Sequence, residues 1–346
     1  MIDVTTLTDG GQQAEEIAAP IIALIESAER SLDIALYDVR LPGKVGDDVA
    51  GAIRAAHARG VAVRIAYNAD GFYKIPVPPP PSTHPELLAA LGVPLQGIPG
   101  EPDLMHHKYV IADGARLWCG STNWTLDSWT REENVIVRLE SAELAAAYAQ
   151  DFEHLWERGV VEGSGAFDAP LLAIGDAQVQ AWFSPGRGEE LAHRIAKQIG
   201  LARRRVRIAS PVLTSGPILG TLAEVLAEKR CEVLGVCDWT QLHAVFGQWK
   251  SSGSAWKMPL LHDVLEGAEF TGKRSTPYAP GRVHDYMHAK ITVADDVSFI
   301  GSFNLSRSGE MNAENVLEIH DAALADRMAA YVDHVRTLYP DVDPPG

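Results

Sequence analysis

The stretch that decides the fold runs from Met105 to Asn134 and reads MHHKYVIADGARLWCGSTNWTLDSWTREEN. Most of its polar residues recur near the other end of the chain, in MHAKITVADDVSFIGSFNLSRSGEMNAEN, from Met287 to Asn315. Both stretches contain His-x-Lys-x-x-x-x-Asp, then Gly-Ser-x-Asn, and then Glu-Asn beginning ten residues after that asparagine. A three-part pattern that occurs twice indicates an internal duplication rather than chance.

The spacing within each stretch predicts a hairpin. Residues two apart along a strand share a face, so His106 and Lys108 are predicted to project together, as are Ser121 and Asn123 further on. An Asp-Gly pair at Asp113, between the two polar pairs, is a common tight-turn sequence. The hairpin would therefore bring the polar pairs side by side.

The elements around the two stretches are also repeated. In each half, a helix, a strand, a second helix and a second strand precede the motif stretch, and a strand and a long helix follow it. Lys108 and Lys290 are 182 positions apart, and Gly120 and Gly301 are 181 apart. A one-residue register change would flip the faces of a strand, so we expect the turn to absorb this difference.

Length and element order predict two α/β halves. A chain of 346 residues is longer than one ordinary domain, and alternating helices and strands are typical of layered α/β folds. The stretch from Gly159 to Ala177 is rich in small residues, as a connection between two units would be. We predict halves at residues 1–165, with the first motif, and 166–346, with the second, and leave the oligomeric state open.

The composition is that of an ordinary globular protein, with 46% apolar and 22% charged residues. A formal charge of −16 argues against a protein that coats nucleic acid or anionic membranes by its overall field, although it allows a local basic site. The N-terminus lacks the pattern of a signal peptide. The longest apolar run, Ile17 to Ile25, contains Pro20 and is too short to span a bilayer. We predict a cytoplasmic protein without integral membrane association.

The paired motifs resemble those of the phospholipase D superfamily, whose members carry two such copies for each active site. The resemblance covers both halves in order. It implies two halves related by a pseudo-twofold axis, each a mixed β-sheet flanked by helices, with both motifs at one site between them. It also implies that one histidine attacks phosphorus to form a phosphohistidine, while the other protonates the leaving group and then activates water or an alcohol. The family tendency makes His106 the nucleophile and His288 the acid and later the base.

The residue types account for this chemistry on their own. A phosphodiester is a monoanion with a poor alkoxide leaving group, so its cleavage requires a nucleophile, an acid and positive charge at the phosphoryl oxygens. A neutral imidazole can attack while an imidazolium donates a proton, so two histidines fill two roles. No metal or other cofactor is then required. The expected phosphate-binding residues are Lys108, Lys290, Ser121, Asn123, Ser302 and Asn304.

Four carboxylates complete the candidate catalytic set. Glu133 and Glu314 match the acidic positions that follow the motif in the superfamily, and the resemblance implies that each accepts a hydrogen bond from an imidazole Nδ1. Such a partner fixes the tautomer and raises the pKa of the histidine. Asp113 and Asp295 are at least as well suited to fixing a turn, because alternation places each of them off the His/Lys face.

Two interpretations compete with catalysis. Each His and Lys could lie on a solvated strand face, which the duplication argues against. Metal binding through His106, His107, His284 and His288 is disfavoured, because the nearby lysines would repel a cation. His107 faces away from His106 on the strand and is expected to be structural.

Two runs without acidic residues, which we expect to form loops, indicate where substrate binds. They extend from Trp239 to His262 and from Thr271 to His284, in a chain with sixteen more acids than bases. Interleaved aromatic and basic side chains suit a channel for single-stranded nucleic acid, and they also suit a lipid interface. The candidate substrate-binding residues are Trp256, Lys257, Lys273, Arg274, Tyr278 and Arg282.

These patterns predict a metal-independent phosphodiesterase and leave its substrate open. The lack of a predicted anchor slightly favours a nuclease acting on nucleic acid. A phospholipase D or transphosphatidylase acting on phospholipids is the alternative. A third possibility is a non-catalytic phosphate-binding module, which two intact histidines argue against. The motifs thus constrain the reaction more closely than the substrate.

Overall fold

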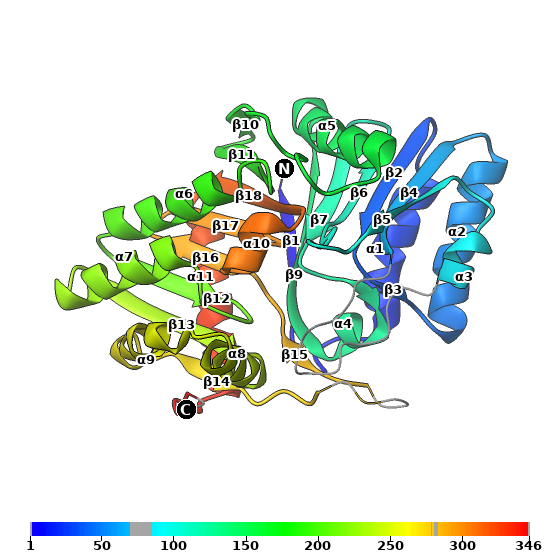
Figure 1. The fold of residues 1–346 in the computed structure, drawn as a ribbon. Helices are drawn as coiled ribbons and strands as arrows, with labels where there is room; N and C mark the ends of the chain where they lie inside the picture. The colour runs from blue at the N-terminus through cyan, green and yellow to red at the C-terminus, as the bar shows by residue number, and fades with distance from the viewer. Residues whose placement is uncertain (1, 70–84, 278, 280–282, 345–346) are drawn as a thin grey trace.

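Two mixed β-sheets, one from each half of the chain, form the frame of the molecule (Figure 1). The structure is a computed structural model and describes residues 2–69, 85–277, 279 and 283–344. The first sheet has the strand order β1-β9-β7-β6-β2-β4-β5, and the second has the order β10-β11-β18-β17-β16-β12-β13-β14. A short strand from the second half, β15, pairs in parallel with the start of β9.

Each half contains the predicted elements in the predicted order, together with strands and helices that were not predicted. Those of the first half are β1 (Asp3–Leu7), α1 (Ala14–Glu26), β2 (Ser31–Leu36), β3 (Val39–Arg40), α2 (Gly43–Ala58), β4 (Ala62–Ala69), α3 (Pro85–Ala89), β5 (Leu95–Pro99), β6 (Lys108–Ala112), β7 (Arg116–Gly120), β8 (Trp124–Thr125), α4 (Leu126–Thr130), β9 (Glu132–Glu140) and α5 (Ala142–Arg158). Those of the second half are β10 (Leu172–Ile174), β11 (Ala177–Ser184), α6 (Gly188–Leu201), β12 (Arg205–Ala209), α7 (Gly216–Ala227), β13 (Glu232–Asp238), α8 (Trp239–Ser251), the 3₁₀ helix η1 (Ala255–Lys257), α9 (Met258–Gly267), β14 (Thr271–Lys273), β15 (Tyr286–Met287), β16 (Ile291–Ala294), β17 (Val297–Gly301), α10 (Arg307–Met311), β18 (Glu314–His320) and α11 (Ala322–Leu338).

The two strand orders correspond position by position. β9, β7, β6, β2, β4 and β5 occupy the places in the first sheet that β18, β17, β16, β12, β13 and β14 occupy in the second. In both sheets the last three of these strands run parallel, and the motif hairpins are antiparallel. This arrangement confirms the predicted fold class, two related halves that are each a mixed sheet flanked by helices.

Three apolar cores hold these layers together. Helices α1 and α2 pack on the outer face of the first sheet, and helices α6, α7 and α9 pack on the outer face of the second. A central core joins the inner faces of both sheets with α5 and α11. Because apolar surface from both halves is buried in this one core, the halves are packed as a unit.

The long helices that follow the motif strands begin at matching caps. The Ser141 hydroxyl accepts a hydrogen bond from the Leu144 N–H at the start of α5, and the Asp321 carboxylate accepts one from the Leu324 N–H at the start of α11. Such caps satisfy an N–H group that has no partner within the helix. Helix α5 ends at Gly159, whose φ of 65° is left-handed and suits glycine.

Each motif forms the predicted hairpin, and the turn absorbs the one-residue difference between the copies. Ala112 pairs with Arg116 in the first hairpin, and Ala294 pairs with Val297 in the second. The first turn therefore consists of residues 113–115 and the second of residues 295–296 only. The strands beyond both turns keep the same faces.

The glycine of each Gly-Ser-x-Asn sequence allows two strands to approach closely. A Cβ atom added at Gly120 would lie 2.1 Å from the Val135 carbonyl oxygen, and one added at Gly301 would lie 2.0 Å from the Asn315 carbonyl oxygen. These contacts are too short for any other residue. The glycines therefore let β9 and β18 pass directly behind the motif.

The first acid-free run, which we expected to form loops near the substrate, is mostly helical. It forms α8, η1 and the start of α9. The pattern was misread because aromatic residues in this run are partly core residues: Trp239 and Phe246 are each 1% exposed and pack on the second sheet. Among the described helices, none has both the length and the apolar character that crossing a bilayer requires.

A buried lysine ties the two halves together. Lys273, at the end of β14, is 2% exposed and donates hydrogen bonds to the carboxylates of Asp9, at 3.2 Å, and Glu133, at 3.1 Å. It also pairs with Asp285 at 3.1 Å, and its ammonium lies 5.1 Å from the centre of the Tyr339 ring. Burial alone would lower the pKa of Lys273, but the surrounding carboxylates, Glu133 first, raise it above its ordinary value.

Removing this cation should destabilise the packing of the halves. In Lys273→Met, three carboxylates lose their shared partner, and we expect the free energy of unfolding to fall by about 3–5 kcal/mol. Lys250→Met, on the exposed side of α8, is the control and should change it by less than about 0.5 kcal/mol. Urea unfolding of both variants measures the difference. Equal, small losses in the two variants would show that Lys273 does not hold the halves together.

Candidate active site

The two motifs meet between the halves, and each motif histidine is held by a side chain from the opposite half. His106 Nδ1 lies 2.8 Å from a carboxylate oxygen of Glu314 in β18. His288 Nδ1 lies 3.1 Å from the side-chain oxygen of Asn134 in β9. The site is therefore complete only when both halves are in place.

The hydrogen-bond network determines which nitrogen of His288 carries the proton. The Asn134 amide N–H donates to the Ser128 carbonyl and to the Glu132 carboxylate, at 3.1 Å in both cases. The amide oxygen therefore faces His288, and because an oxygen without a hydrogen can only accept, the imidazole Nδ1 must be the donor. The Glu314 carboxylate behind His106, when it is ionised, imposes the same tautomer. Both imidazoles thus keep Nε2 for a substrate.

The register of the two halves differs by one residue after the Gly-Ser-x-Asn sequence. The N–H of Ser121 donates to the Val135 carbonyl, whereas the N–H of Ser302 donates to the Asn315 carbonyl. Val135 and Asn315 therefore occupy equivalent positions. The first half contains one more residue than the second between the motif serine and this point of the strand.

This extra residue corrects the expected contact of Glu133. Asn134, not Glu133, occupies the place of Glu314 and reaches the opposite histidine. The Glu133 carboxylate instead accepts hydrogen bonds from Lys273 and from the Tyr339 hydroxyl, the latter at 2.6 Å. Glu133 thus belongs to the contact between the halves. Glu314 does contact an imidazole, as the sequence predicted.

A second carboxylate lies close to His288. A Glu132 oxygen is 3.4 Å from His288 Nδ1, and burial, followed by the neighbouring Asp127 carboxylate, raises the pKa of Glu132 to about 7. Asp127 in turn pairs with His284 at 2.9 Å. Ligand atoms of Glu132, Asp127 and His284 lie within 4.8 Å of one another, which is close enough to hold a cation. Asp127 and His284 already neutralise each other, however, and this weakens the case for a metal there.

Lys108 and Lys290 are buried next to the histidines. Each ammonium donates to the backbone carbonyl of its motif histidine at 2.5 Å. Burial lowers the pKa of Lys108 to about 7, and burial together with the charge of Lys108 lowers the pKa of Lys290. A phosphoryl anion would stabilise both ammonium groups, so the site is electrostatically suited to an anion.

The pKa values of the two motif imidazoles are lowered, as those of the two lysines are. Burial, followed by the charges of Lys108 and Lys290, lowers the pKa of His106 well below its ordinary value. Burial, followed by the same two charges with Lys290 first, does so for His288. Both imidazoles are therefore neutral at neutral pH in the free protein. A bound anion opposes this shift and favours the protonation of one of them.

Asp113 and Asp295 lie in the hairpin turns, at the far ends of the motif strands. The Asp113 carboxylate accepts hydrogen bonds from the N–H groups of residues 29–31, and the Asp295 carboxylate accepts those of residues 203–205. Both residues have positive φ, 55° and 51°. They fix the turns, as alternation along the strands suggested, and we remove them from the candidate catalytic set.

The predicted phosphate-binding serines contact the neighbouring strands. The hydroxyls of Ser121 and Ser302 are fully buried and accept hydrogen bonds from the backbone of β9 and β18, at 2.9 and 3.0 Å. Asn123 and Asn304 differ, because their side-chain oxygens are buried without a hydrogen-bond partner among the described residues. The two asparagines therefore remain candidates for substrate contact.

A groove of about 440 Å³ begins at His106 and contains one of the predicted substrate-binding residues. Asn304 and Arg307, from the segment after β17, and Trp249 and Lys257, from α8 and η1, are among the residues that line it. The Lys257 ammonium lies 5.7 Å from the ring centre of Trp249 and 5.6 Å from the ring centre of Trp256. The Trp256 side chain is 75% exposed. The groove offers polar and basic contacts to the part of a substrate that lies beyond the phosphate.

The other predicted substrate-binding residues are placed differently. Lys273 is enclosed by carboxylates, so its charge is already neutralised and the prediction that it binds substrate is corrected. Arg274 pairs with Asp341 near the C-terminus, at 2.5 Å. Tyr278 and Arg282 lie outside the described residues.

One neighbour of His106 has the structural role that the sequence predicted, and another was not predicted at all. His107 is fully buried between Asp151, 2.8 Å from its Nε2, and Asn315, 3.1 Å from its Nδ1, as expected for a structural residue. The Tyr37 ring packs against His106 with ring centres 4.6 Å apart, and no motif marks it. Asn134, by contrast, could not be identified by counting residues, because Glu133 and Glu314 each lie twelve residues after their motif serine. Only the backbone contacts of the two serines reveal the shifted register.

Comparison with known proteins gives curated relatives that match part of the chain and solved structures that match nearly all of it. The mitochondrial cardiolipin hydrolase of Xenopus tropicalis is 29% identical over 147 residues, which are 40% of this chain and 60% of that protein. The protein of the same name from Chlamydomonas reinhardtii is 30% identical over 135 residues, which are 38% of this chain and 53% of that protein. The chain thus spans little more than half the length of these relatives.

The phosphatidylserine synthase of Haemophilus influenzae Rd KW20 has a crystal structure that matches 96% of this chain and 85% of its own, with a TM-score of 0.66 and 11% identity. At that identity the likeness shows a shared fold alone. The family described as "Cardiolipin synthase, PLD-like domain" matches residues 21–156 and 195–336. These segments cover most of the chain, and each contains one complete motif. The chain therefore belongs to the phospholipase D superfamily.

Proposed function

We propose that this protein is a phosphodiesterase that works through a phosphohistidine. One observation carries the proposal: two imidazoles from opposite halves are each held through Nδ1, so that both keep Nε2 for a substrate next to two buried lysines. A nucleophile, a proton donor and positive charge are the three requirements for cleaving a phosphodiester. The four motif side chains supply all three, so no step of this reaction requires a metal.

The reaction proceeds in two displacements. In the first, the lone pair of His106 Nε2 attacks phosphorus, and the bond to the leaving oxygen breaks as His288, which takes up a proton from solvent on Nε2 when the anion binds, gives that proton to the leaving oxygen. In the second, the now neutral His288 takes a proton from water or an alcohol, whose oxygen attacks phosphorus and releases His106. Lys108 and Lys290 stabilise the charge on the phosphoryl oxygens throughout.

The different partners of the two histidines support this assignment of roles. His106 has a carboxylate, Glu314, at 2.8 Å, which increases the electron density on Nε2 and makes it the better nucleophile. The nearest partner of His288 Nδ1 is the neutral amide of Asn134, at 3.1 Å, and the Glu132 carboxylate is further away, at 3.4 Å, so the His288 imidazolium is less directly stabilised and is the better proton donor. The alternative assignment, with the roles exchanged, is an outcome of the trapping experiment below.

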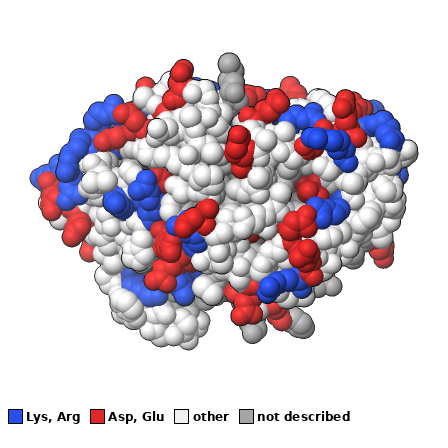
Figure 2. Space-filling view, turned by 90° about the horizontal axis from the view of Figure 1, so that it is seen from above, with Lys and Arg blue, Asp and Glu red and all other residues white. Residues whose placement is uncertain are grey.

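We propose phospholipid as the substrate class, in place of the slight preference for nucleic acid that the sequence suggested. The curated relatives are named as cardiolipin hydrolases. Lys273 and Arg274, which we expected to bind a polyanion, are paired with carboxylates instead. On the face seen in Figure 2, acidic and basic side chains surround an uncharged centre, and basic side chains gather most closely along the left edge. Those relatives are named as mitochondrial, whereas a cytoplasmic location stays a prediction for this chain.

The experiment that tests this function compares substrates with and without a lipid. Purified protein is incubated with bis(4-nitrophenyl) phosphate, vesicles of phosphatidylglycerol or cardiolipin, and single-stranded DNA, with and without EDTA. We expect cleavage of the small diester and of lipid in the presence of EDTA, and its loss by a factor of at least about 10² in His106→Ala and His288→Ala. An acid-labile phosphoryl adduct should map to the peptide that contains His106.

Four outcomes would contradict parts of this proposal. Loss of activity in EDTA would indicate a cation at Asp127, Glu132 and His284. Cleavage of DNA without cleavage of lipid would restore the nuclease interpretation. An adduct on His288 would exchange the roles of the histidines. Binding of phosphate without turnover of any diester would indicate the non-catalytic module.

The shifted register makes a separate prediction about Asn134 and Glu133. Asn134→Leu removes the acceptor behind His288, so kcat for bis(4-nitrophenyl) phosphate should fall by roughly 10². Glu133→Gln removes a partner of Lys273, so it should lower the melting temperature. Because the Glu133 carboxylate is bonded to Lys273 and Tyr339 and not to a motif imidazole, kcat should stay within about threefold. A large loss of kcat in Glu133→Gln with an unchanged melting temperature would show that Glu133 is the true partner of the imidazole.

A further inference from the structure

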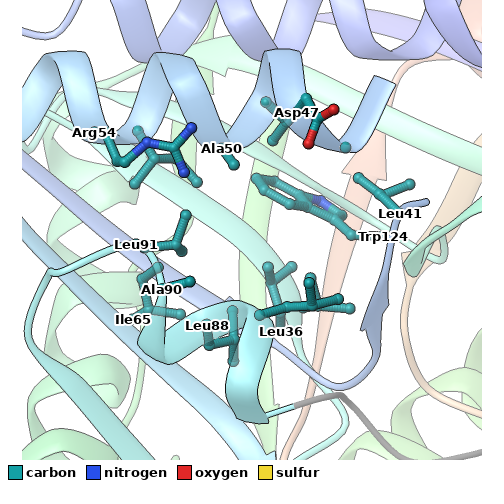
Figure 3. Close-up of a pocket in the computed structure, with 15 residues that line it drawn as sticks. Leu36, Leu41, Asp47, Ala50, Arg54, Ile65, Leu88, Ala90, Leu91 and Trp124 are labelled. Carbon is teal, nitrogen blue, oxygen red and sulfur yellow. The ribbon is translucent and has the colours of Figure 1, made fainter. Parts of the chain in front are cut away.

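An apolar cavity of about 200 Å³ lies in the first half, between α2, α3 and the outer face of the sheet (Figure 3). In Figure 3, α2 contributes Ala50 from one side, α3 and the residues after it contribute Leu88 and Leu91 from the other, and Trp124 closes one end. Among the described residues that line the cavity, only Asp47 and Arg54 are charged, and both are exposed. The rest of the lining consists of Leu36, Val39, Leu41, Gly46, Val49, Ile53, Ile65, Leu87 and Ala90.

This cavity lies on the same face of the sheet as the candidate active site. Leu36 pairs directly with Lys108 across β2 and β6, and residues paired in this way project to one face. The residue after Leu36 is Tyr37, whose ring packs on His106. Trp124 directly follows Asn123 of the first motif. The cavity and the phosphate site therefore share a boundary made of neighbouring residues.

The chemistry of the lining suits a hydrocarbon chain that carries an ester. An apolar cavity of roughly 150 Å³ stays dry and takes up benzene in another protein, so this one is large enough for several methylene groups. The indole N–H of Trp124 is buried without a hydrogen-bond partner among the described residues. A buried donor of this kind is costly unless a ligand satisfies it, and an ester carbonyl at the head of an acyl chain is such an acceptor. A nucleotide offers no group that matches the rest of this lining.

We propose that this cavity binds one acyl chain of the phospholipid substrate while its phosphodiester lies at Lys108 and His106. The inference rests on the proposed function and adds where the lipid is recognised. Headgroup and leaving group then extend into the groove lined by Asn304 and Lys257. Recognition of the chain is thus separated in space from the chemistry at phosphorus.

Two matched substitutions on α2 test this assignment. Ala50→Phe places a ring in the cavity, whereas Ala55→Phe places the same ring on an exposed position of the same helix that does not line the cavity. The substrates are monomeric phosphatidylglycerols with acyl chains of four, six and eight carbons, and bis(4-nitrophenyl) phosphate, which has no acyl chain. For the unmodified protein, kcat/KM should rise by up to roughly fourfold for each methylene that enters the cavity.

We expect Ala50→Phe to lose this dependence on chain length and to cleave bis(4-nitrophenyl) phosphate as the unmodified protein does. Ala55→Phe should keep both properties. If kcat/KM does not rise with chain length in the unmodified protein, or rises equally in Ala50→Phe, the cavity does not hold the chain, and the phosphodiesterase proposal stands on the small diester alone. If the small diester is not cleaved either, the proposed function itself fails.

A binding measurement keeps the two failures distinguishable without turnover. Bromine quenches tryptophan fluorescence on contact, so 11-bromoundecanoic acid bound in the cavity should quench Trp124. We expect quenching in the unmodified protein, in His106→Ala and in Ala55→Phe, and its loss in Ala50→Phe and Trp124→Phe. Equal quenching in Ala50→Phe and the unmodified protein would overturn the assignment of the cavity, whatever the catalytic result.

Discussion

The structure depends on one interaction that occurs twice, the hydrogen bond from the Nδ1 of a motif imidazole to a side chain of the opposite half. Glu314 holds His106, and Asn134 holds His288. A buried imidazole can change its ring orientation and its tautomer unless a hydrogen-bond partner fixes them. Because that partner comes from the opposite half in both cases, neither half can orient its own motif histidine. The central core and the carboxylates around Lys273 keep the halves at the distance that these contacts need. Packing between the halves is therefore part of the chemistry.

One inserted residue makes the duplicated site unequal. It displaces Glu133 from the position that its counterpart keeps in the second half, and an amide takes the place of a carboxylate. The released Glu133 joins Lys273 in the contact between the halves. A fully symmetric site would give two imidazoles of equal basicity, whereas a nucleophile and a proton donor need different ones. The departure from symmetry thus supplies a difference that a two-histidine reaction uses.

Sequence reasoning predicted the fold and the motif residues well, because alternation and turn chemistry are local signals. His106 lies with Lys108 as their spacing implied, and the two motifs meet at one site as the resemblance to the phospholipase D superfamily implied. It misplaced Glu133 because the register of a strand is set by backbone contacts, here those of Ser121, which a residue count between motifs does not reveal. It overrated Lys273 as a substrate contact because a cation looks the same in sequence whether solvent or three carboxylates surround it. The apolar cavity near Trp124 arises from elements far apart in the chain, so no local pattern indicated it.

The measurement that tests this account most directly is the tautomer of the two motif histidines. Long-range ¹H–¹⁵N NMR of protein labelled at histidine, with His106→Gln and His288→Gln for assignment, reports which ring nitrogen carries the proton. Because burial raises the pKa of Glu314 to about 7, the spectrum should be recorded near pH 8, where that carboxylate is ionised. We predict that both imidazoles are neutral and protonated at Nδ1, and that Asn134→Leu changes the tautomer equilibrium of His288 alone. A proton on Nε2 in either histidine of the unmodified protein would contradict the account.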